Sequence, residues 1–371
     1  MAQSLWDLAI KQSRLKAGSV VCYVDLVGSA QPTPSSLVFV GCESSGKSTI
    51  INNFLEKNEV PRKTLALEFN FCRRNRGPCF PKTVVHLWEL GGGVKFADLL
   101  DAIITKDSVE YVKKLRIVIV LDLSKPTEFW THLTHFISSL ESNISAALEQ
   151  SRSQVNRDSR KGKSNHTWQK INANHPDRGL MTVFPVPLTI IGSKYDMFLT
   201  FFQKLKMESQ DIITKLLRFV AHSYGAALFF TNAVDTSMTK KIRNYLNYLA
   251  FDTSMPITPP TLDGGPLHIL PGEDSFDSIG LPPSESYLKL GDECTPFQLW
   301  EKAFIKRFPQ VTISTSAQDN DPGADEQFAE PEVDAIRQLK DEEFERNRRQ
   351  SERSMQVRMQ LASVDEPVFD V

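Results

Sequence analysis

The segment from residue 36 to residue 48 reads Ser36-Leu-Val-Phe-Val-Gly-Cys-Glu-Ser-Ser-Gly-Lys-Ser48, and expectations for the rest of the chain start from it. Its first five residues are mostly apolar and suit a buried strand, and residues 47–57 suit a helix. The eight residues that begin at Gly41 match the phosphate-binding pattern GxxxxGK[ST]. A chance match in a glycine-rich turn is the alternative, and the strand before the loop and the helix after it argue against chance.

The chemistry of this loop is specific. Its glycines let backbone N–H groups face a phosphate, and the helix that follows points its positive end at the anion. Lys47 can neutralise phosphate oxygens and Ser48 can ligate Mg²⁺. The nucleotide contacts predicted from the loop are Gly41, Ser44, Ser45, Gly46, Lys47, Ser48 and Thr49.

Strands and helices are expected to alternate after the loop. The expected strands are 83–90, 116–123, 183–191 and 226–231, and the expected helices are 127–150, 198–222 and 236–251. The run at 116–123, RIVIVLDL, is typical of a strand that is buried on both faces. This order predicts an α/β fold with a mostly parallel sheet and helices on both faces. Residues 151–178 are polar and lack periodicity, so a surface insertion is expected there.

Composition limits the classes of function. The 371 residues carry a formal net charge of −2, so no global charge points to nucleic acid or to an anionic membrane. No apolar run reaches the ~18 residues of a membrane span, and neither a signal sequence nor a lipidation motif is evident, so no membrane insertion is expected. The five cysteines are scattered, which predicts reduced thiols, and two of them, Cys72 and Cys79, do not make a zinc site on their own.

Two later segments indicate that the bound base is guanine. Residues 193–196, Ser-Lys-Tyr-Asp, follow a predicted strand and resemble the [NT]KxD motif of GTPases. There Asp196 would accept two hydrogen bonds from guanine, and the stem of Lys194 would pack along the base. Ser193 replaces the usual Asn or Thr, which predicts a weaker supporting hydrogen bond. Ala233 resembles the loop residue whose backbone N–H meets the guanine O6, although Val234 stands where Lys is usual.

A third segment concerns magnesium and hydrolysis. The string Leu-Trp-Glu-Leu-Gly-Gly-Gly, which ends at Gly93, resembles the LWDxxGQ segment of small GTPases. Glu89 would take the place of the metal-side Asp, and Thr64 would complete the Mg²⁺ shell with Ser48. Gly93 falls where the catalytic Gln would orient the attacking water. Asp122 either acts as a Walker B carboxylate or only closes its strand. The residues predict GTP or GDP with Mg²⁺, weak or absent hydrolysis and no catalytic residue.

Several longer strings resemble the dynein light intermediate chain family, and within it the cytoplasmic dynein 2 branch. They are Ser4-Leu-Trp-Asp-Leu-Ala9, Lys63-Thr-Leu-Ala-Leu-Glu-Phe69, His86-Leu-Trp-Glu-Leu-Gly-Gly-Gly93, Val120-Leu-Asp-Leu-Ser-Lys-Pro126, Phe184-Pro-Val-Pro-Leu188, Ile191-Gly-Ser-Lys-Tyr-Asp196, Leu217-Arg-Phe-Val-Ala-His222, Asp274-Ser-Phe-Asp-Ser-Ile-Gly280 and Phe328-Ala-Glu-Pro-Glu-Val-Asp334. The resemblance implies a Ras-like P-loop domain with a C-terminal extension. It also implies a non-catalytic subunit that binds the cytoplasmic dynein 2 heavy chain and assembles with other dynein 2 subunits.

The same resemblance implies a cellular role. Dynein 2 drives retrograde intraflagellar transport along ciliary microtubules, so the chain is expected to meet the intraflagellar transport machinery indirectly and to support cilium assembly. Its expected locations are the cytoplasm, the microtubule cytoskeleton and the cilium, including the basal body and axoneme. ATP hydrolysis would belong to the heavy chain.

The expected division of the chain has four parts. They are an N-terminal helical segment at 1–27, a Ras-like nucleotide-binding domain at 28–252, an irregular and helical extension at 253–330 and a charged tail at 331–371. The core is expected to end near residue 252, with the extension packed on it or linked to it and a short helix at 297–308. The tail is expected to be helical or disordered, and residues 297–360 are either a partner-binding element or a solvated charged stretch.

Two other classes of function are alternatives to the hypothesis that the chain is a non-catalytic dynein subunit. An independent Ras-like regulatory GTPase would hydrolyse or exchange nucleotide, and its effectors would sense the segments near Thr64 and Glu89. A P-loop kinase would need an Arg-rich lid, which the sequence lacks, and would not need Asp196. Gly93 and the lack of a lipid anchor favour the non-catalytic subunit.

Overall fold

The computed structural model describes residues 34–74, 83–104, 109–155, 175–203, 207–256, 259–262, 265–282, 295–311 and 331–364. The chain divides into two compact units, Met1–Ile313 and Ser314–Val371, and each unit is described by itself. The helical segment expected at 1–27 lies outside the described residues.

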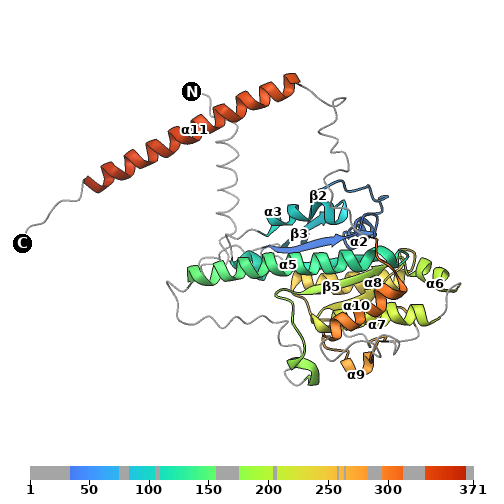
Figure 1. Cartoon of the computed structure of the whole chain (residues 1–371). Helices are drawn as coiled ribbons and strands as arrows, with labels where there is room; N and C mark the ends of the chain where they lie inside the picture. The colour runs from blue at the N-terminus through green and yellow to red at the C-terminus, as the bar shows by residue number, and fades with distance from the viewer. Residues whose placement is uncertain are drawn as a thin grey trace, which may run out of the picture. The chain divides into compact units, whose positions relative to one another are not determined.

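A sheet lies at the centre of the first unit (Figure 1). Its described strands have the order β2-β3-β1-β4-β5-β6-β7. Their bounds are β1 Ser35–Gly41, β2 Leu67–Arg74, β3 Thr83–Leu90, β4 Leu115–Asp122, β5 Leu188–Ser193, β6 Ala227–Phe230 and β7 His268–Ile269. Neighbours from β3 to β6 pair in parallel, whereas the edge strands β2 and β7 pair antiparallel. The expected α/β fold with a mostly parallel sheet is confirmed.

Helices cover both faces of this sheet. Their bounds are α2 Lys47–Phe54, η1 Gly93–Leu99, α3 Leu100–Ile103, α4 Val109–Lys113, α5 Pro126–Val155, η3 Pro176–Gly179, α6 Tyr195–Gln203, α7 Met207–Ser223, α8 Thr236–Phe251, α9 Phe276–Ile279 and α10 Pro296–Arg307. Alternate residues of one strand face opposite sides: Phe39 packs with residues of α2 and α8, and Val38 packs with residues of α5 and α7. Burial on both faces explains why the central strands are continuously apolar.

Several expected elements differ from those observed. The helix expected at 198–222 is two helices, α6 and α7. The strand expected at 183–191 begins only at Leu188, because Pro185 and Pro187 lack the backbone N–H that a central strand needs. Residues 67–74 were not expected to form a strand, yet they pair with β3 along their whole length.

The core continues beyond residue 252, so the expectation that it ends there is wrong. β7 pairs with β6 through Phe229↔His268 and Leu228↔Ile269. Trp300 and Phe304 of α10 are buried in the cluster that contains α5 and α7. A two-residue strand and one short helix have little local signal, and their place depends on contacts that are distant in sequence.

The surface insertion expected at 151–178 is also corrected at both ends. α5 runs on to Val155, and residues 175–179 contain η3, where Asp177 is buried. Residues 156–174 lie outside the described residues.

The second unit contains one long described helix, α11 Pro331–Val364. Its apolar residues Val333, Ile336, Leu339 and Phe344 are exposed. Charged residues dominate the rest and form pairs such as Lys340 with Glu343. Among the described residues of either unit, no helix combines the length and apolarity needed to cross a bilayer.

Candidate functional site

The loop between β1 and α2 is held tightly against the sheet. Gly41 has a φ of 146°, and a Cβ built on it would lie 2.0 Å from the carbonyl oxygen of Val120 on β4. Gly46 has a φ of 89° and forms the N-cap of α2. Only glycine tolerates this close approach of residue 41 to β4. The start of the loop is therefore fixed against the sheet, and the loop leads from there to the N-terminus of α2.

Lys47, the first residue of α2, lies inside this loop. Its ammonium donates hydrogen bonds to the backbone carbonyl oxygens of Cys42, at 2.7 Å, and of Gly41, at 3.2 Å. The residue is only 4% exposed, and burial lowers its pKa. The cation is therefore already placed where a phosphate would meet the loop's N–H groups.

The three predicted magnesium ligands line one cavity of about 280 Å³ with the loop. Ser48 Oγ donates to Glu89 Oε1 at 2.7 Å, and Thr64 Oγ1 donates to Glu68 Oε2 at 3.1 Å. Glu89 is the second-to-last residue of β3 and is 3% exposed, and burial raises the pKa of its carboxyl. A hydroxyl and a carboxylate in contact are oxygen ligands of the kind that Mg²⁺ prefers.

Glu89→Gln is expected to raise the thermal unfolding midpoint of the nucleotide-free protein at pH 7. Because the pKa of Glu89 is raised on folding, its ionised form costs stability, and the cost grows as pH rises from the unfolded pKa through the folded one. The difference from wild type should shrink as pH falls and disappear well below the unfolded pKa of about 4.3, where glutamate is protonated in both states. Glu59→Gln, at an exposed site, is the control. A Glu89→Gln protein less stable than wild type at pH 7 would contradict this electrostatic reading.

A second cavity, of about 290 Å³, contains the predicted base contacts Lys194, Asp196 and Ala233. Gly46 and Thr49 line both cavities, so the two adjoin. Apolar side chains, among them Ile242 and Leu246 of α8, form much of the remaining wall. An apolar slot beside an anion-binding loop has the shape and chemistry to hold a nucleoside and its phosphates.

Lys194, which lines the second cavity, forms an ion pair with Asp122, the last residue of β4. Their Nζ and Oδ2 atoms are 2.5 Å apart. Asp122 also accepts hydrogen bonds from the backbone and hydroxyl of Ser124, at 3.0 and 2.6 Å. These contacts support the reading in which Asp122 closes its strand and orients Lys194, rather than acting as a Walker B carboxylate.

Ser193, the residue that replaces the usual Asn or Thr, contacts the phosphate loop directly. Its Oγ donates to the backbone oxygen of Ser45 at 2.6 Å and lies 3.0 Å from that of Leu121. The short side chain reaches the phosphate loop because β5 ends directly beside it. Ser193 thus makes a supporting hydrogen bond to the loop, and its strength relative to that of Asn or Thr stays a prediction.

Two residues at the phosphate cavity were not anticipated. Glu43, inside the loop, forms an ion pair with Lys63 at 2.6 Å, and both line the cavity. The signal in the sequence that could have identified Glu43 is its acidic side chain within the pattern GxxxxGK[ST].

Gly93, where a GTPase would have its catalytic Gln, has no side chain, and a Cβ built on it would lie 3.4 Å from the Nε2 of His132.

The arrangement can bind a phosphorylated, planar ligand, and it offers no side chain at residue 93 to orient water. Residues 44–49 line the first cavity with Thr64 and Glu89, and the predicted base contacts line the second, whereas Gly41 lines neither. Occupancy by nucleotide and metal remains a prediction.

The fold and the loop define the chain as a Ras-like P-loop protein. The sequence pattern of the family described as dynein light intermediate chain matches residues 19–174. Cytoplasmic dynein 2 light intermediate chain 1 of Danio rerio is 38% identical, over 95% of this chain and 96% of the relative. The Homo sapiens protein of that name is 37% identical, over 95% and 97%. The chain belongs to the dynein light intermediate chain family.

Two solved structures also resemble it. The crystal structure of the dynein light intermediate chain's conserved domain matches with a TM-score of 0.48 and 17% identity, covering 73% of this chain and 98% of that one. Methanosarcina barkeri Roco2 RocCORdC bound to GDP matches with a TM-score of 0.31 and 14% identity, covering 61% and 52%.

Proposed function

We propose that this chain is a non-catalytic light intermediate chain of a cytoplasmic dynein 2 motor. It binds the heavy chain, assembles with the other dynein 2 subunits and supports retrograde intraflagellar transport and cilium assembly. The observation that carries the proposal is similarity along nearly the full length, 37–38% identity over 95% of the chain, to relatives named for that role. The glycine at residue 93, where a GTPase would have its catalytic Gln, supports a scaffold rather than an enzyme.

The proposed place of action follows from the proposed motor. The chain works in the cytoplasm and in the cilium, from the basal body along the axoneme, and meets the intraflagellar transport machinery through its complex. The test is to deplete the chain from ciliated cells and to record the velocity of transport particles returning from the ciliary tip. Slower return and particles accumulated at the tip, both restored by the wild-type chain, are expected. Normal return velocity after complete depletion would contradict the proposal.

The adjoining cavities, in this proposal, bind GTP or GDP with Mg²⁺ as a structural ligand. The loop from Gly41 to Thr49 holds the phosphates, Ser48, Thr64 and Glu89 face the metal, and Lys194, Asp196 and Ala233 meet the base. A ligand that binds only the folded state stabilises that state, by roughly 4 kcal/mol at a thousandfold excess over Kd. Nucleotide would thus support folding and assembly without turnover.

Lys47→Ala is expected to abolish nucleotide binding, because the change removes the one cation buried inside the loop. Purified protein is denatured and the released compounds are separated by chromatography. Wild type and Lys57→Ala, a control at an exposed lysine just after α2, should release guanine nucleotide in equal amounts. Lys47→Ala should release none. An empty wild-type protein would refute the nucleotide proposal and leave the subunit proposal intact.

An independent regulatory GTPase remains the second candidate, because Thr64, Ser48 and Glu89 line one cavity as switch and metal residues would. Single-turnover measurement with GTP discriminates between the two. Hydrolysis well above the rate of GTP in buffer would favour the GTPase, and unchanged GTP would favour the scaffold.

A further inference from the structure

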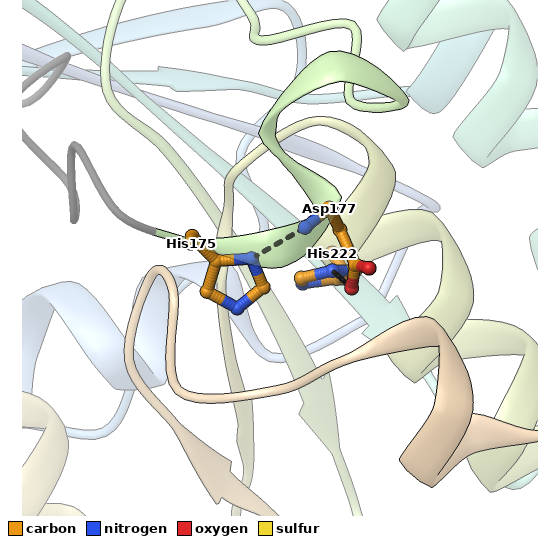
Figure 2. A group of neighbouring side chains, drawn as sticks. All are labelled: His175, Asp177 and His222. Atoms are coloured by element: carbon orange, nitrogen blue, oxygen red, sulfur yellow. Dashed lines mark hydrogen bonds and ion pairs between the residues drawn. The ribbon is translucent and has the colours of Figure 1, made fainter.

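A compact group of ligand-type side chains lies away from both nucleotide cavities. His175 and Asp177 lie at the start of η3, and His222 lies in the last turn of α7 (Figure 2). Each offers one nitrogen or oxygen atom, and these three atoms lie within 4.8 Å of one another. His222 and Asp177 are buried and His175 is half-buried. None of the three lines either nucleotide cavity.

The hydrogen bonds of His175 determine which of its nitrogens can bind a cation. Its Nε2 lies 2.9 Å from the carbonyl oxygen of Asp274. A carbonyl oxygen only accepts, so Nε2 carries the proton and Nδ1 carries the lone pair. Nδ1 faces Asp177, whose backbone N–H donates to it at 3.2 Å. An imidazole whose distal N–H is fixed by a carbonyl has the outer-shell support that metal-binding histidines usually have.

The carboxylate is supported in the same way. Oδ2 of Asp177 lies 2.8 Å from Nε2 of His222 and accepts the backbone N–H of Phe276 at 2.9 Å. The segment 274–276 therefore holds both His175 and Asp177 toward His222. Two imidazoles and one carboxylate form a ligand set that binds zinc with a fourth position left for water.

We propose that His175, Asp177 and His222 bind one divalent transition-metal ion, of which zinc is the representative probe. His175 contributes Nδ1, whose lone pair exchanges the backbone N–H of Asp177 for the ion, and Asp177 contributes a carboxylate oxygen and His222 Nε2. The proton that His222 Nε2 donates to Asp177 moves to Nδ1 of the same ring, so the imidazole stays neutral and Nε2 presents its lone pair to the ion. Ligands of tetrahedral zinc lie roughly 3.3 Å apart, so small side-chain shifts close the site.

Binding of the ion would link elements that are distant in the sequence. The ion would connect η3 to the C-terminal turn of α7, and through Asp274 and Phe276 it would hold the segment that leads into α9. These elements belong to the core and to the extension after residue 252. The site would therefore fasten the extension to the core independently of any nucleotide.

The test uses tag-free full-length protein, stripped of metal and titrated with zinc in a calorimeter. One zinc per chain and a zinc-dependent rise in the thermal unfolding midpoint are expected. His222→Gln keeps an N–H donor for Asp177, and His175→Asn keeps an acceptor for the backbone of residue 177. Each should lower zinc affinity at least about 100-fold, because loss of an outer-shell partner alone costs 10–100-fold. Each should also abolish the zinc-dependent rise in the midpoint, measured against the same variant without zinc. His135→Gln, at an exposed histidine of α5, is the control.

Three outcomes would overturn the proposal. Wild-type protein that binds no zinc would mean that the three side chains form only a hydrogen-bonded clamp. Zinc binding that persists undiminished in both variants would place the ion elsewhere. Cobalt(II) bound with a sulfur-to-metal charge-transfer band would assign the ion to cysteines.

Discussion

Arg218→Ala is expected to lower the free energy of unfolding by about 3–5 kcal/mol, because it leaves a buried charge without its partner. Arg218 and Asp274 are 2% and 3% exposed at their side chains, and Nε and Nη2 of Arg218 each donate to a carboxylate oxygen of Asp274 at 2.8 Å. Arg218 also donates to the hydroxyl of Ser278 at 2.9 Å. Urea denaturation of wild type and variant measures the loss.

Arg243→Ala is the matched control for this change. Arg243 pairs with Glu56 at 2.8 Å, but the Glu56 side chain is 71% exposed. Solvent screens such a pair, so the expected cost is at most about 1 kcal/mol. Equal, small losses in both variants would contradict the packing of residues 274–278 against α7.

Phe304→Ala is expected to cost about 3–5 kcal/mol, as large-to-small changes of buried aromatic residues do. Phe304 of α10 is fully buried, with its ring centroid 5.2 Å from those of Phe129 and Phe308 and 6.0 Å from that of Trp130. Truncation would open a cavity between α10 and α5. The midpoint of urea denaturation reports the loss.

Phe344→Ala, on α11, is the control for this second change. Its side chain is 66% exposed, so the expected effect is within about 0.5 kcal/mol of zero. An effect of Phe304→Ala as small as that of Phe344→Ala would mean that α10 is not part of the core. The core would then end near residue 252, as the sequence alone predicts.

Elements with strong local signals could be predicted from the sequence. The bounds of β3 and α8 match the expected 83–90 and 236–251, and the helix expected at 297–308 is α10 at Pro296–Arg307. Each has a periodicity or a cap that lies within the element. The GxxxxGK[ST] pattern likewise placed its loop between a strand and a helix.

Elements that form only because they pair with residues distant in sequence could not be predicted from the sequence. β2 has exposed charged and aromatic residues and is a strand because β3 pairs with it. β7 is two residues long and pairs with β6 about 40 residues earlier in the chain. Nothing within either segment contains the information that its partner supplies.

The residues of the candidate site also differ in whether the sequence alone could predict them. The motif residues of the phosphate loop were identified by their order, whereas the Ser193–Ser45 bond and the Glu43–Lys63 pair arise only from the packing of strand ends. His175 and Asp177 meet His222 across more than 40 residues of chain, so no spacing rule could have grouped them.

Fractionation by size of the tagged chain from ciliated cells, with mass spectrometry of the proteins that migrate with it, tests the proposed subunit role. Migration in a very large complex that contains a dynein heavy chain and intraflagellar transport proteins is the expected result. Migration as a free species near the 41.9 kDa of the chain alone, with no heavy chain recovered, would contradict the subunit role and make the independent GTPase the leading candidate.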